Sequence, residues 1–267
     1  MPYLSSNGIR MYYDEAGQGE PLLLIMGITA PGAVWARHTA AWQQSFRCLM
    51  PDNRGVGRSD RPRGPYTTAQ MADDHAGLLE ALDLPPVRVV GCSMGSAIAL
   101  QLALRHPGRV RSLVLCCPWV HCDAQTARTF DQLVTWRRRL RPAEFTGALQ
   151  WLIHGAASWK DPAFRRQAAQ ARRRAAHQDP VQSVANLAAQ AAACVGHDVR
   201  ADVHRIRVPT LVLGGEEDRF TPPWMAQEVA AGIPGAQWHL YPGAGHAFHW
   251  ECIDDFNPRC AEWLAAH

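Results

Sequence analysis

The sequence predicts an α/β fold in which a mostly parallel sheet carries helices on both faces. Short apolar segments typical of strands recur through the first half of the chain and return near its end, and helical patterns separate the later ones. This alternation is typical of a parallel sheet whose crossover helices cover both of its faces. The 267 residues, 47% of them hydrophobic, suffice for one large domain that contains an insertion.

The elements of this fold can be placed in order along the chain. The expected strands are 9–13, 22–26, 46–50, 87–90, 112–116, 210–214 and 237–241, and the clearest helices between them are 68–82 and 97–105. In a parallel sheet, the loops that follow the strands meet at one edge. Functional side chains are therefore expected in the loops after these strands.

From about residue 123 to about residue 204 the strands stop, and helices with clear starts take over. Proline follows Arg141, Asp161 and Asp179, each time at an expected first helical position, and Gly155 is expected to close one helix. The expected domains are a core of residues 1–120 and 205–267 and a helical cap of residues 121–204. Since the ends of the insertion meet strands that look like sheet neighbours, one interrupted domain is the simplest interpretation.

Composition argues against several classes of protein. No apolar run approaches the roughly 18 residues of a spanning helix, and the first residues lack the features of an export signal. We therefore expect a cytoplasmic protein with no membrane partner. A net charge of +3 does not indicate nucleic-acid binding. A monomer and a homodimer both remain open.

The eight cysteines are expected to be small buried side chains rather than a disulfide framework, because no export signal accompanies them. The segment 116–122, with three cysteines and one histidine, matches no usual zinc spacing, so no metal site is expected there.

One serine stands between two glycines where an expected strand meets an expected helix, in the segment Gly91-Cys92-Ser93-Met94-Gly95. The glycines permit a sharp turn that holds the serine in a strained, exposed position. The turn also directs the Met94 amide and the positive end of the helix toward one point. Ser93 is therefore the candidate nucleophile, which requires a base and an orienting group behind that base.

Two loops after the last strands supply these partners. His246 follows the last strand in a glycine-rich loop and is the candidate base. Asp218 follows the preceding strand and is the candidate acid, with Glu216, Glu217 and Asp123 as alternatives. The order Ser, Asp, His along the chain is that of α/β-hydrolase triads.

Taken together, these segments resemble the serine hydrolases of the α/β-hydrolase superfamily over nearly the whole chain. The segment 52–59, Asp-Asn-Arg-Gly-Val-Gly-Arg-Ser, resembles the family's Asp-x-Arg-Gly-x-Gly-x-Ser loop, and residues 66–84 resemble the helix that follows it. Residues 208–218 and 245–251 resemble the family's acid and histidine segments. The resemblance implies an eight-stranded, mostly parallel sheet with helices on both faces and an inserted helical cap.

The resemblance also implies an oxyanion hole. Its second donor in this family is a backbone amide just after the third strand, usually in a His-Gly-x turn, and Met26-Gly27-Ile28 occupies that place. We therefore expect the amides of Ile28 and Met94 to form the hole. Methionine in place of histidine leaves the hydrogen bonding of this loop open. Ser96 also departs from the family pattern, since many relatives carry a further glycine there.

The expected reaction is hydrolysis of a carboxylic ester or lactone of a small, largely apolar substrate through an acyl-enzyme, with neither metal nor organic cofactor. A serine at position 93 argues against haloalkane dehalogenases and epoxide hydrolases of this fold, which use a carboxylate. Carbon–carbon bond hydrolysis and cofactor-free perhydrolysis are alternatives on the same triad. A small-ligand receptor with slow turnover is an alternative of another class, because fold alone does not fix function.

Other conspicuous residues have two interpretations each. Trp119, Trp136, Trp151 and Trp159 either line an apolar substrate pocket or bury the cap against the core. The arginines within 137–141 and 165–174 either attract an acidic substrate or form solvated helix faces.

Three residues near the candidate base, His246, His249 and Glu251, form a possible metal set, but one loop supplies them all and no second segment completes it. Glu251 is expected to anchor the histidine loop instead. Cys92, beside the candidate nucleophile, is expected to be buried and inert.

Overall fold

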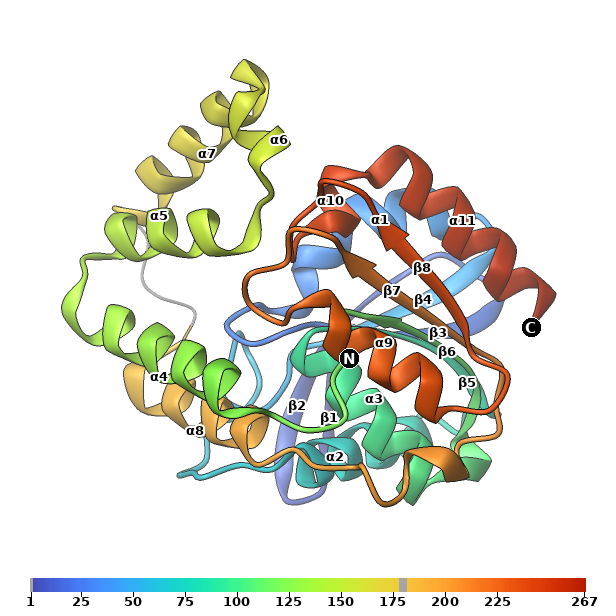
Figure 1. The fold of residues 1–267 in the computed structure, drawn as a ribbon. Helices are drawn as coiled ribbons and strands as arrows, with labels where there is room; N and C mark the ends of the chain where they lie inside the picture. Colours follow the sequence, from blue (N-terminus) through green and yellow to red (C-terminus); the bar gives the residue numbers. More distant parts are fainter. Residues whose placement is uncertain (1, 178–181) are drawn as a thin grey trace.

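The computed structural model describes residues 2–177 and 182–267, and its centre is a single twisted sheet of eight strands (Figure 1). The strand order is β1-β2-β4-β3-β5-β6-β7-β8. The pairs β1–β2 and β2–β4 are antiparallel, and every other neighbouring pair is parallel. The predicted mostly parallel sheet is thus confirmed.

All seven expected strands are present. The strands are β1 (Tyr3–Ser6), β2 (Ile9–Ala16), β3 (Glu20–Ile25), β4 (Phe46–Pro51), β5 (Val87–Cys92), β6 (Val110–Cys116), β7 (Thr210–Gly215) and β8 (Gln237–Tyr241). The eighth, β1, has no apolar run that could reveal it, because Ser6 is its one buried side chain.

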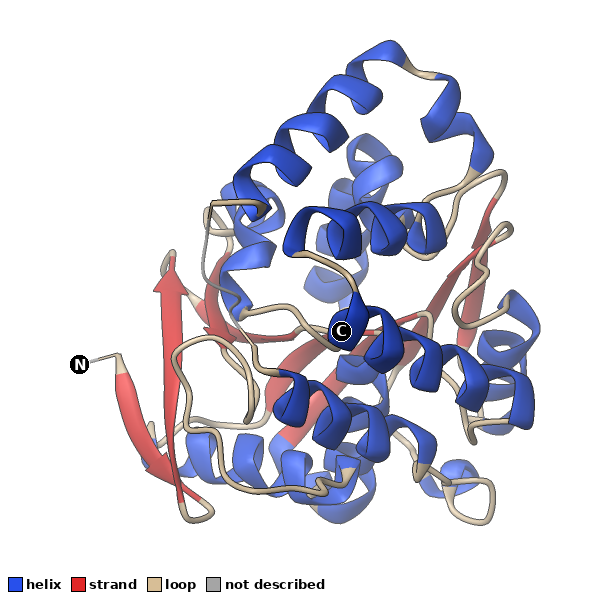
Figure 2. Cartoon of the chain, turned by 90° about the vertical axis from the view of Figure 1, so that its left-hand side faces the viewer, coloured by secondary structure: helices blue, strands red, loops and turns tan. Residues whose placement is uncertain are grey.

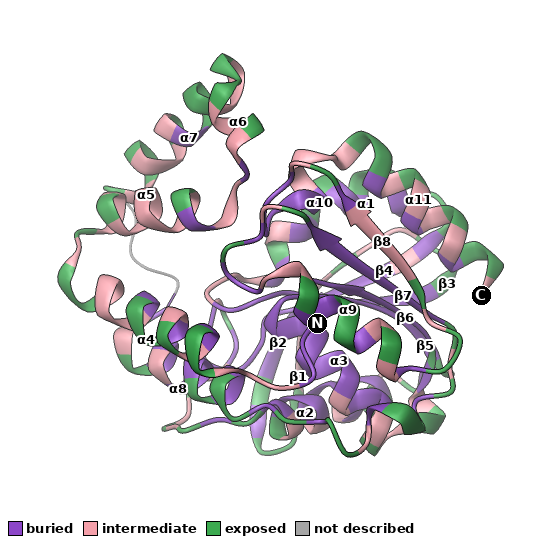
Figure 3. Cartoon of the chain, in the orientation of Figure 1, coloured by how far each residue is buried: buried purple, intermediate pink, exposed green. Residues whose placement is uncertain are grey.

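Alternating side chains of the strands feed two separate cores. In β3, Leu23 and Ile25 belong to one buried cluster, and Leu22 and Leu24 belong to the other. This period of two is the geometry of a strand buried on both faces. Figure 3 shows the central strands as an almost continuous buried layer.

Helices cover both faces, as Figure 2 also shows. The core helices are α1 (Ala36–Trp42), α2 (Thr68–Ala81), α3 (Met94–Arg105), α9 (Pro223–Gly232), α10 (Phe248–Glu251) and α11 (Ile253–Ala266). Side chains of α2, α3 and α9 join the first cluster, and side chains of α1, α10 and α11 join the second. The expected helix 97–105 begins earlier, at Met94, because the turn at Ser93 leads directly into it.

Among the described residues, five α-helices lie between β6 and β7, where an insertion is expected. They are α4 (Ala124–Arg139), α5 (Pro142–Ile153), α6 (Ala156–Lys160), α7 (Pro162–Ala175) and α8 (Val184–Val195), and α5 to α7 project away from the sheet in Figure 1. The two ends of this region lie side by side, since the Val199 amide donates to the Val120 carbonyl at 2.8 Å and His121 forms a bridge with Asp198. The exact domain boundaries stay a prediction.

The expected helix starts at Pro142 and Pro162 are confirmed, and the Asp161 carboxylate caps the second of them. The start expected after Asp179 lies outside the described residues.

Gly155 does not close a helix as expected. Helix α5 ends at Ile153, and Gly155 precedes α6 with an extended backbone at φ −71°. A Cβ atom at this position would lie 2.4 Å from the Gly243 carbonyl oxygen. The glycine is therefore required by close packing against the histidine loop. A search of the described residues for a helix both long enough and apolar enough to cross a bilayer finds none.

Candidate active site

Ser93 occupies a sharp turn between β5 and α3. Its backbone, at φ 56° and ψ −120°, lies in a region that side chains other than glycine rarely adopt. A Cβ atom on Gly95 would lie 2.0 Å from the Ile25 carbonyl oxygen, and one on Gly91 would lie 2.6 Å from the Gly95 carbonyl oxygen. Both glycines are thus needed because backbone segments pass close to them, and the predicted strained turn is present.

Ser93 is 4% exposed, so the prediction of an exposed serine is wrong: the turn directs it into an internal cavity. Its hydroxyl has no hydrogen-bond partner among residues 2–177 and 182–267. It lines a cavity of about 280 Å³ together with His246. The serine–histidine hydrogen bond is often long or poorly aligned in an unliganded enzyme and shortens when substrate binds. The hydroxyl is therefore available to react within a cavity that also contains the expected base.

His246 and Asp218 form a direct pair. The His246 Nδ1 atom lies 2.7 Å from Asp218 Oδ2, and the other carboxylate oxygen accepts the amides of Phe220 and Thr221 at 2.8 and 2.9 Å. Because the carboxylate accepts, Nδ1 carries the proton and Nε2 keeps its lone pair. This is the tautomer that a general base requires.

The pair also changes the acidity of the imidazole. Burial lowers the pKa of His246, but the charge and hydrogen bond of Asp218 outweigh it, so that the pKa is raised above the ordinary value of 6.5. Asp218 itself is 5% exposed and is fixed by neighbouring amides. The imidazolium that forms after proton transfer would therefore be stabilised.

The loop after β3 lies against the serine. A Cβ atom on Gly27 would lie 3.1 Å from the Ser93 Cβ atom, so glycine permits this close approach. In the described part of the chain, neither the Ile28 amide nor the Met94 amide donates to another protein group, and Ile28 lines the cavity. Two free amides near the serine fit the expected oxyanion hole.

The hydrogen bonding of this loop, left open by the Met26 substitution, involves Asn53. The Asn53 side-chain amide donates to the Met26 carbonyl at 2.8 Å, and His75 Nε2 lies 2.9 Å from the Asn53 side-chain oxygen. The Asp-Asn-Arg loop thus holds the oxyanion loop in place. Ser96 is the other departure from the family pattern. Its Oγ atom lies 2.7 Å from the Gly91 carbonyl oxygen and 2.8 Å from the Cys116 carbonyl oxygen, and these contacts anchor the start of α3.

The fold and site can now be compared with known proteins. A family profile for the alpha/beta hydrolase fold matches residues 20–252 of the chain. The chain belongs to the α/β-hydrolase family. The protein named "Putative carbamate hydrolase RutD" of Pantoea ananatis (strain LMG 20103) is 32% identical over 267 residues, which cover 95% of this chain and 93% of that one.

Solved structures agree with the family. The enol-lactonase from Burkholderia xenovorans LB400 matches with a TM-score of 0.88 at 25% identity, covering 99% of this chain and 100% of that chain. A thermophilic esterase from Thermogutta terrifontis matches with a TM-score of 0.84 at 25% identity, over 99% and 97% of the two chains. The family and these neighbours support a hydrolytic enzyme.

The alternatives to Asp218 in this α/β hydrolase have other roles. Glu216 accepts the Gly243 amide at 2.8 Å, and Glu217 accepts the Ala156 amide at 2.6 Å. Asp123 caps α4 by accepting the Thr126 amide at 2.7 Å. Among these four carboxylates, Asp218 is the one that the structure pairs with His246.

None of the four tryptophans expected from the sequence lines the cavity of about 280 Å³. Trp119 is fully buried and packs on Phe130, and Trp136 packs against the same core cluster. Trp159 contacts Phe164 edge-on, and Trp151 is 56% exposed. Trp119 and Trp136 therefore fit the packing interpretation. Trp159 packs within the cap and Trp151 is largely exposed, so these two fit neither interpretation.

Other apolar side chains line the cavity instead. They include Val34, Leu149, Ile153, Phe220 and Trp250, so that the lining combines the cap helix α5 with loops of the core. Sequence reasoning missed them because side chains so far apart in the chain share no local pattern. Trp250 alone had a usable signal, its position four residues after the candidate base.

A larger hollow of about 790 Å³ adjoins the cavity and shares Val34 and Trp250 with it. Arg37 and Arg174 line this hollow. Helix α7, which carries the five arginines within 165–174, has Ala168 as its one buried side chain. The arginine runs are thus mainly a solvated surface, as the second interpretation holds.

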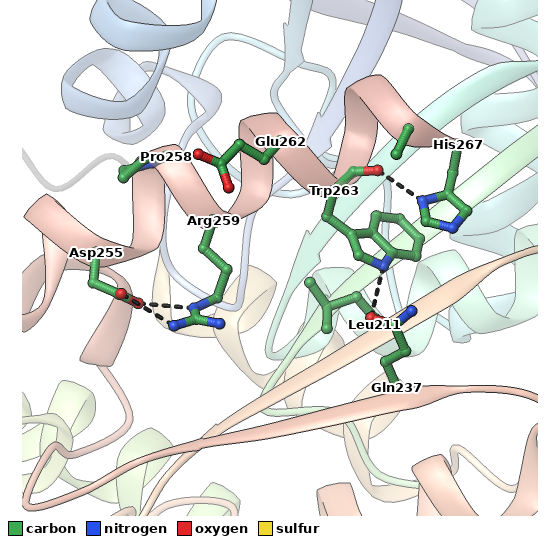
Figure 4. Close-up of a pocket in the computed structure, with 9 residues that line it drawn as sticks. Leu211, Gln237, Asp255, Pro258, Arg259, Glu262, Trp263 and His267 are labelled. Carbon is green, nitrogen blue, oxygen red and sulfur yellow. Dashed lines mark hydrogen bonds and ion pairs between the residues drawn. The ribbon is translucent and has the colours of Figure 1, made fainter.

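A third hollow lies against α11 and β8, and neither Ser93 nor His246 lines it (Figure 4). Asp255 pairs with Arg259 there, and Trp263 donates to Gln237 at 3.1 Å. Its polar groups are largely engaged with one another, so it is a poor candidate for the active site.

Potential metal ligands are also engaged within the protein. In the described residues, the one group of at least three ligand side chains within 4.8 Å of one another is Cys117, Asp218 and His246. The Asp218–His246 hydrogen bond uses the carboxylate and nitrogen that a metal would need. Glu251 accepts the amides of Gly155 and Gly245 at 2.9 and 2.6 Å, so it anchors the histidine loop as expected.

Proposed function

We propose that this α/β hydrolase cleaves a carboxylic ester or lactone of a small, largely apolar substrate through an acyl-enzyme on Ser93. One observation carries the proposal: the His246–Asp218 pair, with 2.7 Å between Nδ1 and Oδ2, shares a cavity with a serine on a strained turn whose hydroxyl has no partner in the described part of the chain. This is the constellation that activates a serine for attack on an acyl carbon.

The proposed reaction begins when His246 Nε2 removes the proton of Ser93 as Oγ attacks the acyl carbonyl. Asp218 holds the imidazole in the required tautomer and stabilises its cation. The amides of Ile28 and Met94 donate to the oxyanion, each lowering the barrier by about 2.7–4 kcal/mol. The imidazolium protonates the leaving alcohol. Water then attacks the acyl-enzyme with His246 as its base, and Ser93 leaves with the proton as the carboxylic acid is released.

The volume and lining of the cavity support a small, largely apolar substrate. A volume of about 280 Å³ lined mainly by apolar side chains fits a short acyl or alcohol group rather than a long or charged one. Leu149 and Ile153 reach it from α5, so we propose that the cap of residues 121–204 sets the size limit. The similar proteins named as an enol-lactonase, an esterase and a putative carbamate hydrolase support a substrate with an acyl group.

The test combines covalent labelling with turnover. A fluorophosphonate probe should label Ser93 once per chain, and kcat/KM should be measured for p-nitrophenyl esters of increasing length, lactones, an aryl carbamate and a ring-fission dienoate. We expect labelling at Ser93 and fastest turnover of short esters or lactones. Preferred turnover of the dienoate would instead identify a carbon–carbon bond hydrolase. Stoichiometric labelling without turnover of any substrate would indicate a ligand receptor.

A further inference from the structure

A buried thiol with its own histidine lies beside the candidate nucleophile. Cys92 Sγ is 3.6 Å from His249 Nε2, and both residues line the cavity of about 280 Å³ that contains Ser93. The proposed hydrolysis uses neither side chain. Cys92 is the one cysteine among the residues that line this cavity.

Hydrogen bonds behind His249 determine which nitrogen faces the thiol. Asn257 Oδ1 lies 2.7 Å from His38 Nδ1, and His38 Nε2 lies 3.0 Å from His249 Nδ1. Burial lowers the pKa of His38 to about 3, so its ring is neutral at physiological pH. An amide oxygen only accepts, so the proton of His38 is on Nδ1, and its Nε2 accepts from His249. His249 Nε2 therefore presents a lone pair to the Cys92 thiol.

Packing holds this chain of groups rigid. His38 is fully buried and stacks on Trp42 at a centroid distance of 5.5 Å. Trp42 Nε1 donates to the Asn257 carbonyl at 3.0 Å, and this bond fixes Asn257, the last member of the hydrogen-bonded series. Cys92, His249 and the His38–Asn257 pair behind it thus repeat the arrangement of a nucleophile, a histidine and the group that orients the histidine.

The two partly exposed cysteines lack these features. Cys122 and Cys252 are partly exposed, and burial raises the pKa of Cys122 to about 12 and also raises that of Cys252. For Cys92, the neighbouring Cys117 and His249 side chains lower the pKa, against the effect of burial. A lowered pKa increases the fraction of thiolate, which is the form that reacts.

We propose that Cys92 is a modification site for small, uncharged α,β-unsaturated carbonyl compounds, with His249 as its general base and His38 and Asn257 as positioning residues. The compound enters the apolar cavity with its carbonyl group and reacts at its β-carbon. This reactivity differs from the inert thiol expected from the sequence.

The chemistry is an addition without any change of oxidation state. His249 Nε2 takes the thiol proton, and the sulfur electron pair forms a bond to the β-carbon as the carbon–carbon π bond breaks. The released electron pair forms an enolate, which takes the proton back from His249 at the α-carbon. The adduct then occupies the cavity beside Ser93, and hydrolysis stops.

N-ethylmaleimide, an uncharged unsaturated imide, is the probe. We expect peptide mass spectrometry of the native protein to show Cys92 alkylated at least about tenfold faster than Cys122 or Cys252, although Cys92 is only 4% exposed. A maleimide that carries a carboxylate should reverse this order, because the apolar cavity excludes the charge. Alkylation of Cys122 or Cys252 first by N-ethylmaleimide, with Cys92 unmodified, would overturn the proposal.

Two variants test the role of the base. His249→Gln should slow labelling of Cys92 about tenfold or more and leave the rate at Cys252 unchanged; equal rates at Cys92 before and after the substitution would remove His249 from the proposal. The ester hydrolysis that remains in Cys92→Ala should not be inhibited by N-ethylmaleimide. Ester hydrolysis by Cys252→Ala should be inhibited as strongly as that of the parent protein. Loss of activity in treated Cys92→Ala would contradict the link between adduct and inhibition.

The labelling ratio does not depend on the proposed ester hydrolysis. Peptide masses report Cys92 even in a protein without detectable turnover, and the fluorophosphonate reports Ser93 separately. Prior fluorophosphonate labelling should protect Cys92, because the phosphonyl group fills the shared cavity. Unchanged labelling of Cys92 in fully phosphonylated protein would contradict the shared cavity.

Discussion

The edge of the sheet and the outer cap helices α5 to α7 differ in how completely their side chains are buried. Ser93, Asp218 and His246 are 4%, 5% and 7% exposed, and each follows a strand of the same sheet. In the cap, α7 buries only Ala168, and Figure 3 shows mostly intermediate and exposed residues over α5 to α7. The rigid edge can position reacting groups to a fraction of an ångström, and the cap can vary in sequence without disturbing them.

Two carboxylates join these regions. Glu251 accepts amides from both the cap residue Gly155 and the histidine-loop residue Gly245. Glu217, beside the proposed catalytic acid, accepts the amide of Ala156 in the cap. The cap is thus fixed where it meets the loops that carry His246 and Asp218. Substitutions in both regions, together with the pH dependence, test how the sheet edge and the cap divide their roles.

The largest effect is expected from Ser93→Ala. Loss of the nucleophile should lower kcat by about 10⁴- to 10⁶-fold, measured with a p-nitrophenyl ester at saturating concentration. Ser112→Ala is the matched control, because that buried hydroxyl also lacks a partner but lies elsewhere on β6. Substantial hydrolysis by Ser93→Ala would end the proposed mechanism.

Asp218→Asn should lower kcat by about 10⁴-fold, because an amide in that place favours the wrong tautomer of His246. Glu216→Gln, in the same loop, should change kcat a few-fold at most, since its carboxylate accepts the Gly243 amide at 2.8 Å and is not the group that pairs with His246. Equal losses in the two variants would show that Asp218 has no special role.

Glu251→Ala tests the junction between cap and core. The variant loses the acceptor for the Gly155 and Gly245 amides, which should lower the free energy of unfolding by about 2–4 kcal/mol and kcat/KM by about 10- to 100-fold. Chemical denaturation and ester kinetics measure the two effects. The exposed Glu262 on α11 supplies the control, and unchanged kinetics in Glu251→Ala would show that the junction does not position His246.

The pH dependence of kcat/KM tests the electrostatics of the edge. Asp218 raises the pKa of His246 above 6.5, so the imidazole keeps its proton to a higher pH than a free histidine. A general base must be neutral, and activity should therefore fall as the pH drops through a midpoint above 6.5. The residual activity of Asp218→Asn should have a lower midpoint, and a midpoint at or below 6.5 in the parent protein would argue against this pairing in solution.

The smallest effects are expected in the cap. Trp151→Ala should change kcat/KM less than about twofold and stability by less than about 0.5 kcal/mol, because its side chain is 56% exposed. Trp250→Ala, on the cavity wall, should raise KM about tenfold for a short ester. A larger kinetic effect at Trp151 than at Trp250 would mean that the cap closes over the site differently in solution.

Much of the core was predictable because its signals are local. Seven strands follow from apolar runs, and the turn at Ser93 follows from two glycines in fixed positions. Strand β1 was missed, since a short edge strand with one buried residue has no such run. Gly155 was misinterpreted because its reason, the nearby Gly243 carbonyl, lies 88 positions away in the chain (243 − 155).

The sequence by itself determined the order of the candidate catalytic residues along the chain. A serine between two glycines comes first, and an acid and a histidine follow the last two strands. Only the tertiary structure decided which carboxylate pairs with His246, which apolar side chains line the cavity, and that Cys92 has a histidine of its own. Local patterns record backbone geometry and burial, whereas pairing between distant side chains depends on how the folded elements pack against one another.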